Sequence, residues 1–185
     1  MNEGQAAGRY AQALLELGTE AGELEQLVSS LSDFAAAYAS SRELQRDLSN
    51  PTIPEAERQA VIRALASRFS VSDLGRRSLL LIMRRRRLSA LPEIARQLTA
   101  LYDLKAGILR GHVVTAAAMP EGYFSDLAAS IGRAAQKRVL LTHSIDESLI
   151  GGVLLRIGDA TIDVSIRGRL GEMQQNLLQA FARAS

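Results

Sequence analysis

The spacing of apolar residues changes once along this chain of 185 residues, and that change limits the folds it can adopt. Before about residue 106, apolar side chains recur every three or four positions, which places them on one face of an α-helix. After Gly107 the pattern turns to short apolar runs of strand length, mixed with two helical stretches. We therefore expect an α+β protein of two domains, residues 1–106 and residues 107–185, of which the first is wholly helical.

Six helical segments joined by short connections make up the first domain, which predicts an antiparallel six-helix bundle. The most regular of them spans about residues 21–39. Residues Thr52–Glu55 have the pattern of a capping box, in which the threonine hydroxyl accepts a hydrogen bond from the Glu55 amide. Ser72 or Asp73 can cap the next helix. Side chains expected in the core include Leu31, Phe34, Val61, Ile62, Ile94 and Leu98.

The fifth helical segment is apolar on more than one face, because it ends in the unbroken run Leu79–Met83. Such a helix either lies at the centre of a bundle or carries a groove that a partner fills. Four arginines, Arg84–Arg87, follow. They could neutralise the phosphates of a nucleic acid or of an anionic membrane. Positive charge also suits the C-terminal end of a helix, however, and no aromatic residues for base stacking lie among them.

The second domain is expected to be a small α/β unit. Its pattern predicts strands at residues 110–117 and 139–142 with a helix at 124–135 between them. Two further strands flank Gly158-Asp159, which is the signal of a β-hairpin. In the second of these strands Ile162, Val164 and Ile166 alternate with polar residues and should face the core. A terminal helix follows, with the apolar stripe Leu170, Met173, Leu177 and Phe181.

Residues that could carry chemistry are scarce. The chain has no cysteine, which excludes disulfides, thiolate zinc sites and cysteine nucleophiles. It has no phosphate-binding loop, and His112 and His143 lack partners at metal-ligand spacing. The hydroxyls and carboxylates of residues 144–148 could suggest a hydrolase, but a turn explains them better. We therefore expect no catalytic residue, no cofactor and no metal.

Charge is divided unevenly along the chain. Residues 1–57 carry a net charge of −7, residues 58–110 carry +9, and residues 111–185 are balanced. Such a division indicates either complementary packing of facing helices or two faces offered to different partners, and we favour the first. The overall excess of two positive charges is too small to indicate nucleic-acid binding by itself.

Residues 145–153, Ile-Asp-Glu-Ser-Leu-Ile-Gly-Gly-Val, resemble a motif of the delta subunit of the F-type ATP synthase, the oligomycin-sensitivity-conferring protein family. The resemblance continues through Gly158-Asp159 to residues 165–170, Ser-Ile-Arg-Gly-Arg-Leu. Residues 9–14 and 87–92 resemble the family's first helix and the opening of its sixth, so nearly the whole chain is covered. The chain departs from the family at Glu147, at Val164, and at Arg84–Arg87, where the family's turn is richer in Asn and Gly.

The resemblance implies a non-catalytic stator subunit that works without a cofactor and links the catalytic head to the peripheral stalk, so that rotor torque drives ATP synthesis. It implies that a groove between the first and fifth helices receives the N-terminal helix of an alpha subunit. Tyr10, Ala13, Leu17 and Leu81 are the candidates for that contact. The second domain would meet the stalk's b subunits, with candidates Leu170, Met173, Leu177 and Phe181.

The same resemblance implies one copy per complex, no bound nucleic acid, and a peripheral position at the cytoplasmic face of the bacterial plasma membrane, reached only through partners. The alternative hypothesis from the residues is a helical nucleic-acid-binding protein that uses its arginines.

Overall fold

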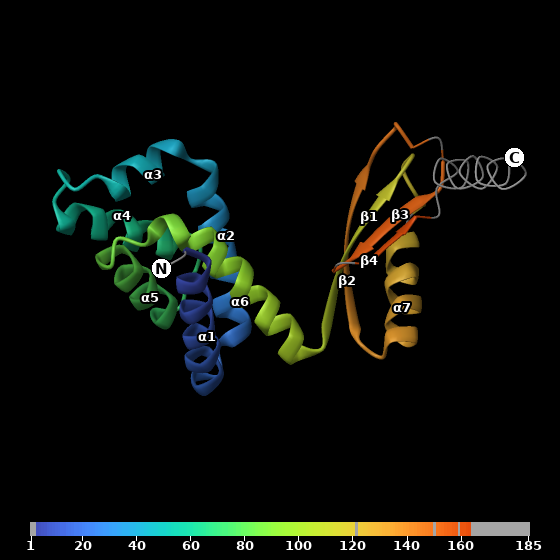
Figure 1. Ribbon diagram of the computed structural model, residues 1–185, viewed down its shortest axis with the longest axis horizontal. Helices are drawn as coiled ribbons and strands as arrows, with labels where there is room; N and C mark the ends of the chain where they lie inside the picture. Colours follow the sequence, from blue (N-terminus) through green and yellow to red (C-terminus); the bar gives the residue numbers. More distant parts are fainter. Residues whose placement is uncertain (1–2, 121, 150, 159, 164–185) are drawn as a thin grey trace, which may run out of the picture. The chain divides into compact units, whose positions relative to one another are not determined.

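The computed structural model describes residues 3–120, 122–149, 151–158 and 160–163, and the chain divides into two compact units, residues 1–105 and 106–185 (Figure 1). The described part of the N-terminal unit is helical, as predicted. Its helices are α1 (Glu3–Ala21), α2 (Leu24–Ser40), α3 (Arg42–Ser49), α4 (Glu55–Arg68), α5 (Asp73–Arg84) and α6 (Leu91–Ala106), with a short 3-10 turn at Leu88–Ala90.

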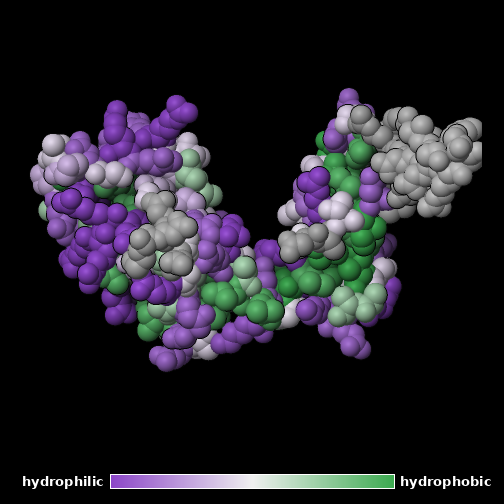
Figure 2. Space-filling model, viewed as in Figure 1, coloured by the Kyte–Doolittle hydropathy of each residue, from purple (hydrophilic) through white to green (hydrophobic). Residues whose placement is uncertain are grey.

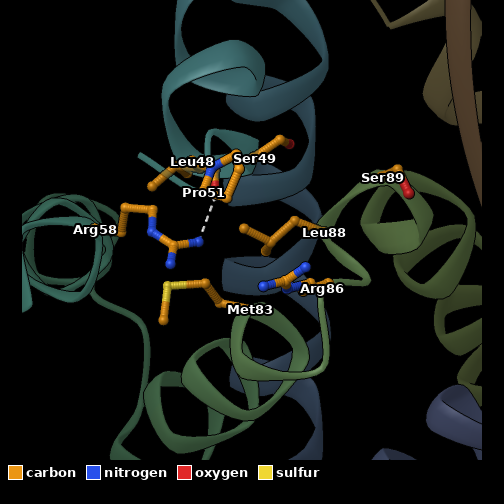
Figure 3. A pocket seen from close by; sticks show the side chains of 8 residues that line it. All are labelled: Leu48, Ser49, Pro51, Arg58, Met83, Arg86, Leu88 and Ser89. Atoms are coloured by element: carbon orange, nitrogen blue, oxygen red, sulfur yellow. Dashed lines mark hydrogen bonds between the residues drawn. The ribbon is translucent and has the colours of Figure 1, made fainter. Parts of the chain in front are cut away.

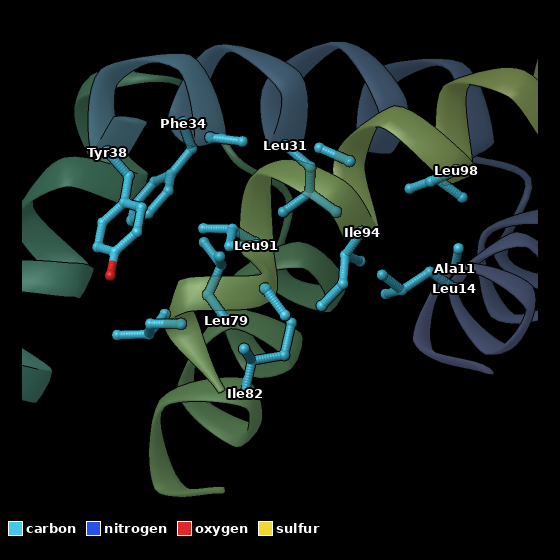
Figure 4. Packing of buried hydrophobic residues seen from close by; sticks show 14 of the residues in the cluster. Ala11, Leu14, Leu31, Phe34, Tyr38, Leu79, Ile82, Leu91, Ile94 and Leu98 are labelled. Carbon is cyan, nitrogen blue, oxygen red and sulfur yellow. The ribbon is translucent and has the colours of Figure 1, made fainter. Parts of the chain in front are cut away.

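The core of the N-terminal unit lies where α1, α2, α5 and α6 meet (Figure 4). Burying one such leucine, isoleucine or phenylalanine side chain contributes about 1.5–3 kcal/mol. Phe34 of α2 also meets Phe69, at the end of α4, edge to face with 6.2 Å between ring centres. The side chains in this core that are almost wholly shielded from solvent include Ala11, Leu14, Leu31, Phe34, Leu79, Ile82, Leu91, Ile94 and Leu98.

Two helix starts test the predicted caps. Ser72 caps α5 as predicted, because its Oγ accepts from the Gly75 amide at 3.2 Å. The capping box at Thr52 is wrong: the Thr52 hydroxyl donates to Oδ1 of Asn50 at 2.7 Å, and α4 begins at Glu55 without a side-chain cap. Asparagine side chains compete strongly for nearby backbone and hydroxyl donors, and here Asn50 also accepts from the Thr52 amide at 3.0 Å.

Two other expectations in this unit need correction. Helix α1 runs on to Ala21, so the second helix starts at Leu24; Gly22, with φ of 70°, reverses the chain between them. Val61 is 41% exposed, whereas Ile62 is fully buried. Successive residues of a helix point about 100° apart, and here Ile62 faces the core while Val61 lies toward its edge.

The C-terminal unit is a small α/β fold, as predicted. Its described part contains β1 (Ile108–Thr115), α7 (Tyr123–Ala135), β2 (Arg138–Ile145), β3 (Val153–Ile157) and β4 (Ala160–Asp163). These strands form a sheet in the order β2-β1-β3-β4. Strands β1 and β2 are joined by a connection that contains α7 and pair in parallel. Strand β3 pairs antiparallel with both β1 and β4. Hydrophobic side chains gather over this unit on the face seen in Figure 2.

The predicted hairpin is confirmed. Ile157 pairs with Ala160 across a two-residue turn that starts at Gly158, whose φ of 55° is the left-handed value such a turn needs. The expectation that Ile162 is buried is wrong, because its side chain is exposed in the described part of the unit. Val164, Ile166 and the predicted terminal helix lie outside the described residues.

A single residue, Gly107, separates α6 from β1. Its φ is 64°, a value that glycine adopts without the steric cost other residues pay. The Gly107 carbonyl accepts from the Arg138 amide at 3.2 Å, which extends the pairing of β1 with β2. On the helical side, Nζ of Lys105 donates to the hydroxyl of Thr19 at 2.8 Å.

Among the helices in the described ranges, none combines the length and the apolar character that crossing a bilayer requires.

Replacing Leu98 by alanine should lower the free energy of unfolding of the N-terminal unit by about 2–5 kcal/mol, because the fully buried side chain leaves a cavity in the core. The matched control is Leu104→Ala on the same helix, where the side chain is 77% exposed and the loss should be below about 1 kcal/mol. Urea denaturation of each variant measures the difference. Equal losses would contradict this description of the core.

Candidate functional site

An open groove of about 670 Å³ lies between the N-terminal half of α1 and the C-terminal end of α5. We call it the α1/α5 groove. Its lining combines small and apolar side chains with positively charged ones and contains no acidic residue among those described. The lining residues are Ala6, Arg9, Tyr10, Ala13, Leu81, Arg85 and Arg87.

Helix α1 supplies one wall because it has two different faces. Ala7, Ala11 and Leu14 are buried against the core, spaced by four and three positions. The second stripe, Tyr10, Ala13 and Leu17, is more accessible: Tyr10 is half-buried and borders the core, Ala13 is exposed, and Leu17 is 46% exposed.

Helix α5 supplies the other wall. Leu79, Ile82 and Met83 are buried in the core, and Leu81 points away from it with 50% of its surface exposed. This helix is therefore apolar on more than one face, as its sequence indicates. A half-exposed leucine beside an exposed alanine offers an apolar surface that a partner could cover.

The structure brings Tyr10, Ala13 and Leu81 together in the α1/α5 groove. Leu17 lies one turn further along α1 and does not line it. The second set of candidates, Leu170, Met173, Leu177 and Phe181, lies outside the described residues. Sequence reasoning missed Ala6 and the basic side chains of the lining. The run of four arginines indicated a positively charged segment that contains Arg85 and Arg87, but the sequence did not show which of the four side chains would face the groove.

The arginine run is divided by the way α5 ends. The amide of Arg87 donates to the Ile82 carbonyl at 3.0 Å, and the amide of Arg86 donates to the Met83 carbonyl at 2.8 Å. These two hydrogen bonds form a Schellman motif, whose left-handed residue is usually glycine. Here that residue is Arg86, with φ of 55°.

The four side chains consequently have three different surroundings. Arg84 pairs with Glu55 at the start of α4, at 3.2 Å from Nε to Oε1. This ion pair joins the acidic early segment to the basic later one, as complementary packing predicts. Arg85 and Arg87 line the α1/α5 groove. Arg86 lines a different and smaller cavity.

That smaller cavity, of about 120 Å³, places Arg86 across from Arg58, with Met83 and Leu88 between them (Figure 3). Arg58 is held by backbone carbonyls: its Nε donates to the Ile53 carbonyl at 3.2 Å and its Nη1 to the Leu48 carbonyl at 3.4 Å. Carbonyls in the last turn of a helix lack partners within the helix, and Leu48 lies in the last turn of α3. Arg58 therefore fastens the connection between α3 and α4.

A third depression, between α2 and α6, has small side chains such as Ala36 and Ala39 in its walls and Arg96 among its lining residues. Arg96 donates two hydrogen bonds to Glu93, at 2.8 and 2.7 Å. These bonds, together with one from Gln97, lower the pKa of Glu93 from 4.5 to about 2. Arg96 therefore forms a local ion pair with Glu93 at the start of α6.

In the C-terminal unit, the sheet brings together a histidine and a serine that the sequence places 32 positions apart. Nε2 of His112 lies 3.0 Å from Oγ of Ser144. Nδ1 of His112 lies 3.0 Å from the hydroxyl of Thr142. In a Ser-His-Asp triad this ring nitrogen instead donates to a carboxylate, which orients the histidine. The neighbouring His143 stacks on Phe124 with ring centres 4.2 Å apart.

The carboxylates of the cluster at residues 144–148 lie in a turn, as predicted, whereas Ser144 and Ile145 belong to the end of β2. Oδ1 of Asp146 accepts from the Ser148 amide at 2.9 Å, and the Asp146 carbonyl accepts from the Leu149 amide at 3.1 Å. Across the residues that the structure describes, no three His, Cys, Asp or Glu side chains gather in a way that could hold a metal ion.

Comparison with known proteins gives consistent matches. Residues 6–177 match the family model described as ATP synthase delta (OSCP) subunit. The chain is 35% identical over 173 residues to ATP synthase subunit delta of Nitratidesulfovibrio vulgaris, covering 92% of this chain and 94% of that protein. It is 37% identical over 169 residues to the subunit of the same name in Paracoccus denitrificans, covering 91% and 89%.

Among solved structures, the fold resembles a chain of the Toxoplasma gondii mitochondrial ATP synthase hexamer, with a TM-score of 0.73 at 23% sequence identity. The likeness covers 93% of this chain and 97% of that one.

Truncating Leu81 to alanine should lower the free energy of unfolding by about 1 kcal/mol or less, because half of its surface is already exposed to water. Leu79→Ala, two positions earlier on α5, should cost about 2–5 kcal/mol because Leu79 is fully buried. Urea denaturation compares them. A loss at Leu81 as large as that at Leu79 would assign Leu81 to the core.

Replacing Arg86 by glycine should raise the free energy of unfolding by about 1 kcal/mol, because glycine adopts the left-handed conformation without steric cost. The control is Arg85→Gly, at a residue with φ of −79°, where glycine should destabilise by about 0.5–1 kcal/mol. Thermal denaturation of both variants checks the opposite signs.

Proposed function

The chain belongs to the family of ATP synthase delta (OSCP) subunits, and on that premise we propose that it links the catalytic head of the synthase to the peripheral stalk. Delta subunits are non-catalytic structural subunits, which agrees with the sequence-based expectation that no residue acts in catalysis. The chain therefore acts within the ATP synthase through the surfaces it offers to other subunits.

The α1/α5 groove is the observation that carries this proposal. Two helices present an exposed alanine, a half-exposed leucine and a half-buried tyrosine to one open groove. An amphipathic helix binds by laying its apolar face into such a groove, and small residues such as Ala6 and Ala13 allow its backbone to come close. We propose the N-terminal helix of an alpha subunit as the occupant.

Leu17, although outside the lining, extends the apolar stripe of α1 by one turn and would meet the far end of a longer partner helix. Covering the exposed half of the Leu81 side chain would contribute about 1 kcal/mol. Several such contacts together would supply the affinity between this protein and the partner helix.

The second half of the proposal concerns the stalk. We propose that the C-terminal unit meets the b subunits, with Leu170, Met173, Leu177 and Phe181 as candidate contacts. The protein would then be held at the cytoplasmic face of the bacterial membrane by its partners, in one copy per complex.

The alternative, a nucleic-acid-binding protein, gains no support from the comparisons. The surroundings of the four arginines also argue against it: Arg84 is paired with Glu55, and Arg86 lines a different cavity from Arg85 and Arg87. A backbone-binding surface requires several cations that follow one line of phosphates.

A synthetic peptide of about 20 residues from the N-terminus of the alpha subunit should bind the full chain in isothermal titration calorimetry. Leu81→Arg should weaken binding tenfold or more, since a charge would replace an apolar contact in the groove. The matched control is Val61→Arg, an exposed apolar residue of α4 outside the groove, which should leave the affinity unchanged.

Circular dichroism of both variants should show unchanged helicity. An absence of heat with the wild-type chain, or an equal effect of the two substitutions, would contradict the proposed site. A steeply salt-dependent affinity for DNA in place of peptide binding would favour the alternative.

A further inference from the structure

We propose that Arg85 and Arg87 make the α1/α5 groove selective for a partner helix that carries acidic side chains on the edge facing the end of α5. The inference rests on the proposed function, because it names the chemistry of the helix that occupies the groove. It also gives a role to two members of the arginine run, which departs from the family at this turn.

The lining of the groove is the first observation. Its apolar part comes from Ala6, Ala13 and Leu81, with the ring of Tyr10 beside them. Its charged part is entirely positive among the described residues, and Arg85 and Arg87 both come from the end of α5. A helix laid into the groove would bury its apolar face on the first part and bring one flank against the two guanidinium groups.

The second observation is that these two guanidinium groups have no partner among the residues that the structure describes. Within the described ranges, neither Arg85 nor Arg87 has a side-chain hydrogen bond or an ion pair. Arg84, the next residue along, is by contrast paired with Glu55. A guanidinium group presents a planar set of donors that matches a carboxylate, so an acidic side chain is its natural partner.

The end of α5 explains why these two residues act together. Because Arg86 takes the left-handed conformation, the chain reverses there, and the residues on either side of it line the same groove while Arg86 lines another cavity. A left-handed arginine is sterically unfavourable, and such residues persist where the surroundings hold them. Here the two Schellman hydrogen bonds hold it.

The size of the effect follows from exposure. Arg85 is exposed and Arg87 is half-buried, so each ion pair at the edge of the groove would be only partly shielded from water. Pairs of this kind change affinity by about twofold to fivefold each and are screened by salt. Apolar contacts would therefore supply most of the affinity, and the arginines would supply selectivity and faster association.

The test uses the double variant Arg85→Gln/Arg87→Gln of the full chain and the same alpha-subunit peptide, titrated at 50 and 300 mM NaCl. We expect the double variant to bind about fivefold to tenfold more weakly at low salt and to lose most of the salt dependence that the wild type shows. Arg84→Gln is the control, because Arg84 is paired outside the groove, and it should bind as the wild type does. A second peptide, with each Asp and Glu replaced by Asn and Gln, should bind both proteins equally.

Wild-type affinity and salt dependence in the double variant would overturn the inference, as would a natural peptide without acidic side chains. The proposed function would survive either outcome if Leu81→Arg still weakened binding tenfold or more. Failure of the wild-type chain to bind the peptide at any salt concentration would overturn both. A loss of affinity with Arg84→Gln equal to that of the double variant would assign the effect to overall charge and would also overturn the inference.

Discussion

Helix α1 packs into the N-terminal unit through small residues, and the groove exists because of that packing. Ala7 and Ala11 are fully buried, and at Gly18 a methyl group would come within 3.0 Å of the side chains of Leu24 and Leu27. These small residues let α1 lie close against the core, into which it also inserts Leu14. Tyr10 and Ala13 line the groove on another face of the helix, together with the outward-pointing Leu81 of α5.

The periodicity of the sequence predicted the helices and the change from helical to α/β structure, because burial of apolar faces dominates both. The hairpin was predictable from its turn, where Gly158 adopts a left-handed φ. Periodicity failed where the outcome depends on neighbours that it does not describe. At Thr52 a neighbouring asparagine accepts the hydrogen bond of the hydroxyl, and of the adjacent apolar residues Val61 and Ile62 only the second is covered by other helices. Ile162 shows a third limit, since alternation identifies two faces of a strand without saying whether anything covers either one.

The candidate site, like the fold, was predictable from the sequence only in part. The excess of apolar residues on α5 indicated either a central helix or a groove, and the family resemblance pointed to Tyr10, Ala13 and Leu81, which do line one groove. The basic edge of that groove was not predictable, because the direction of four consecutive arginines depends on a single φ angle at Arg86. Conversely, the sheet brings His112 and Ser144 together, but the hydroxyl of Thr142 faces Nδ1 of His112, the position that a carboxylate takes in a Ser-His-Asp triad.

The short junction between the two units has a mechanical consequence. Gly107 alone separates α6 from β1, and hydrogen bonds from Lys105 to Thr19 and from Arg138 to Gly107 fasten the chain on either side. Any force carried along the backbone between the two units therefore passes through Gly107, whose φ of 64° a residue with a Cβ would adopt only at a steric cost.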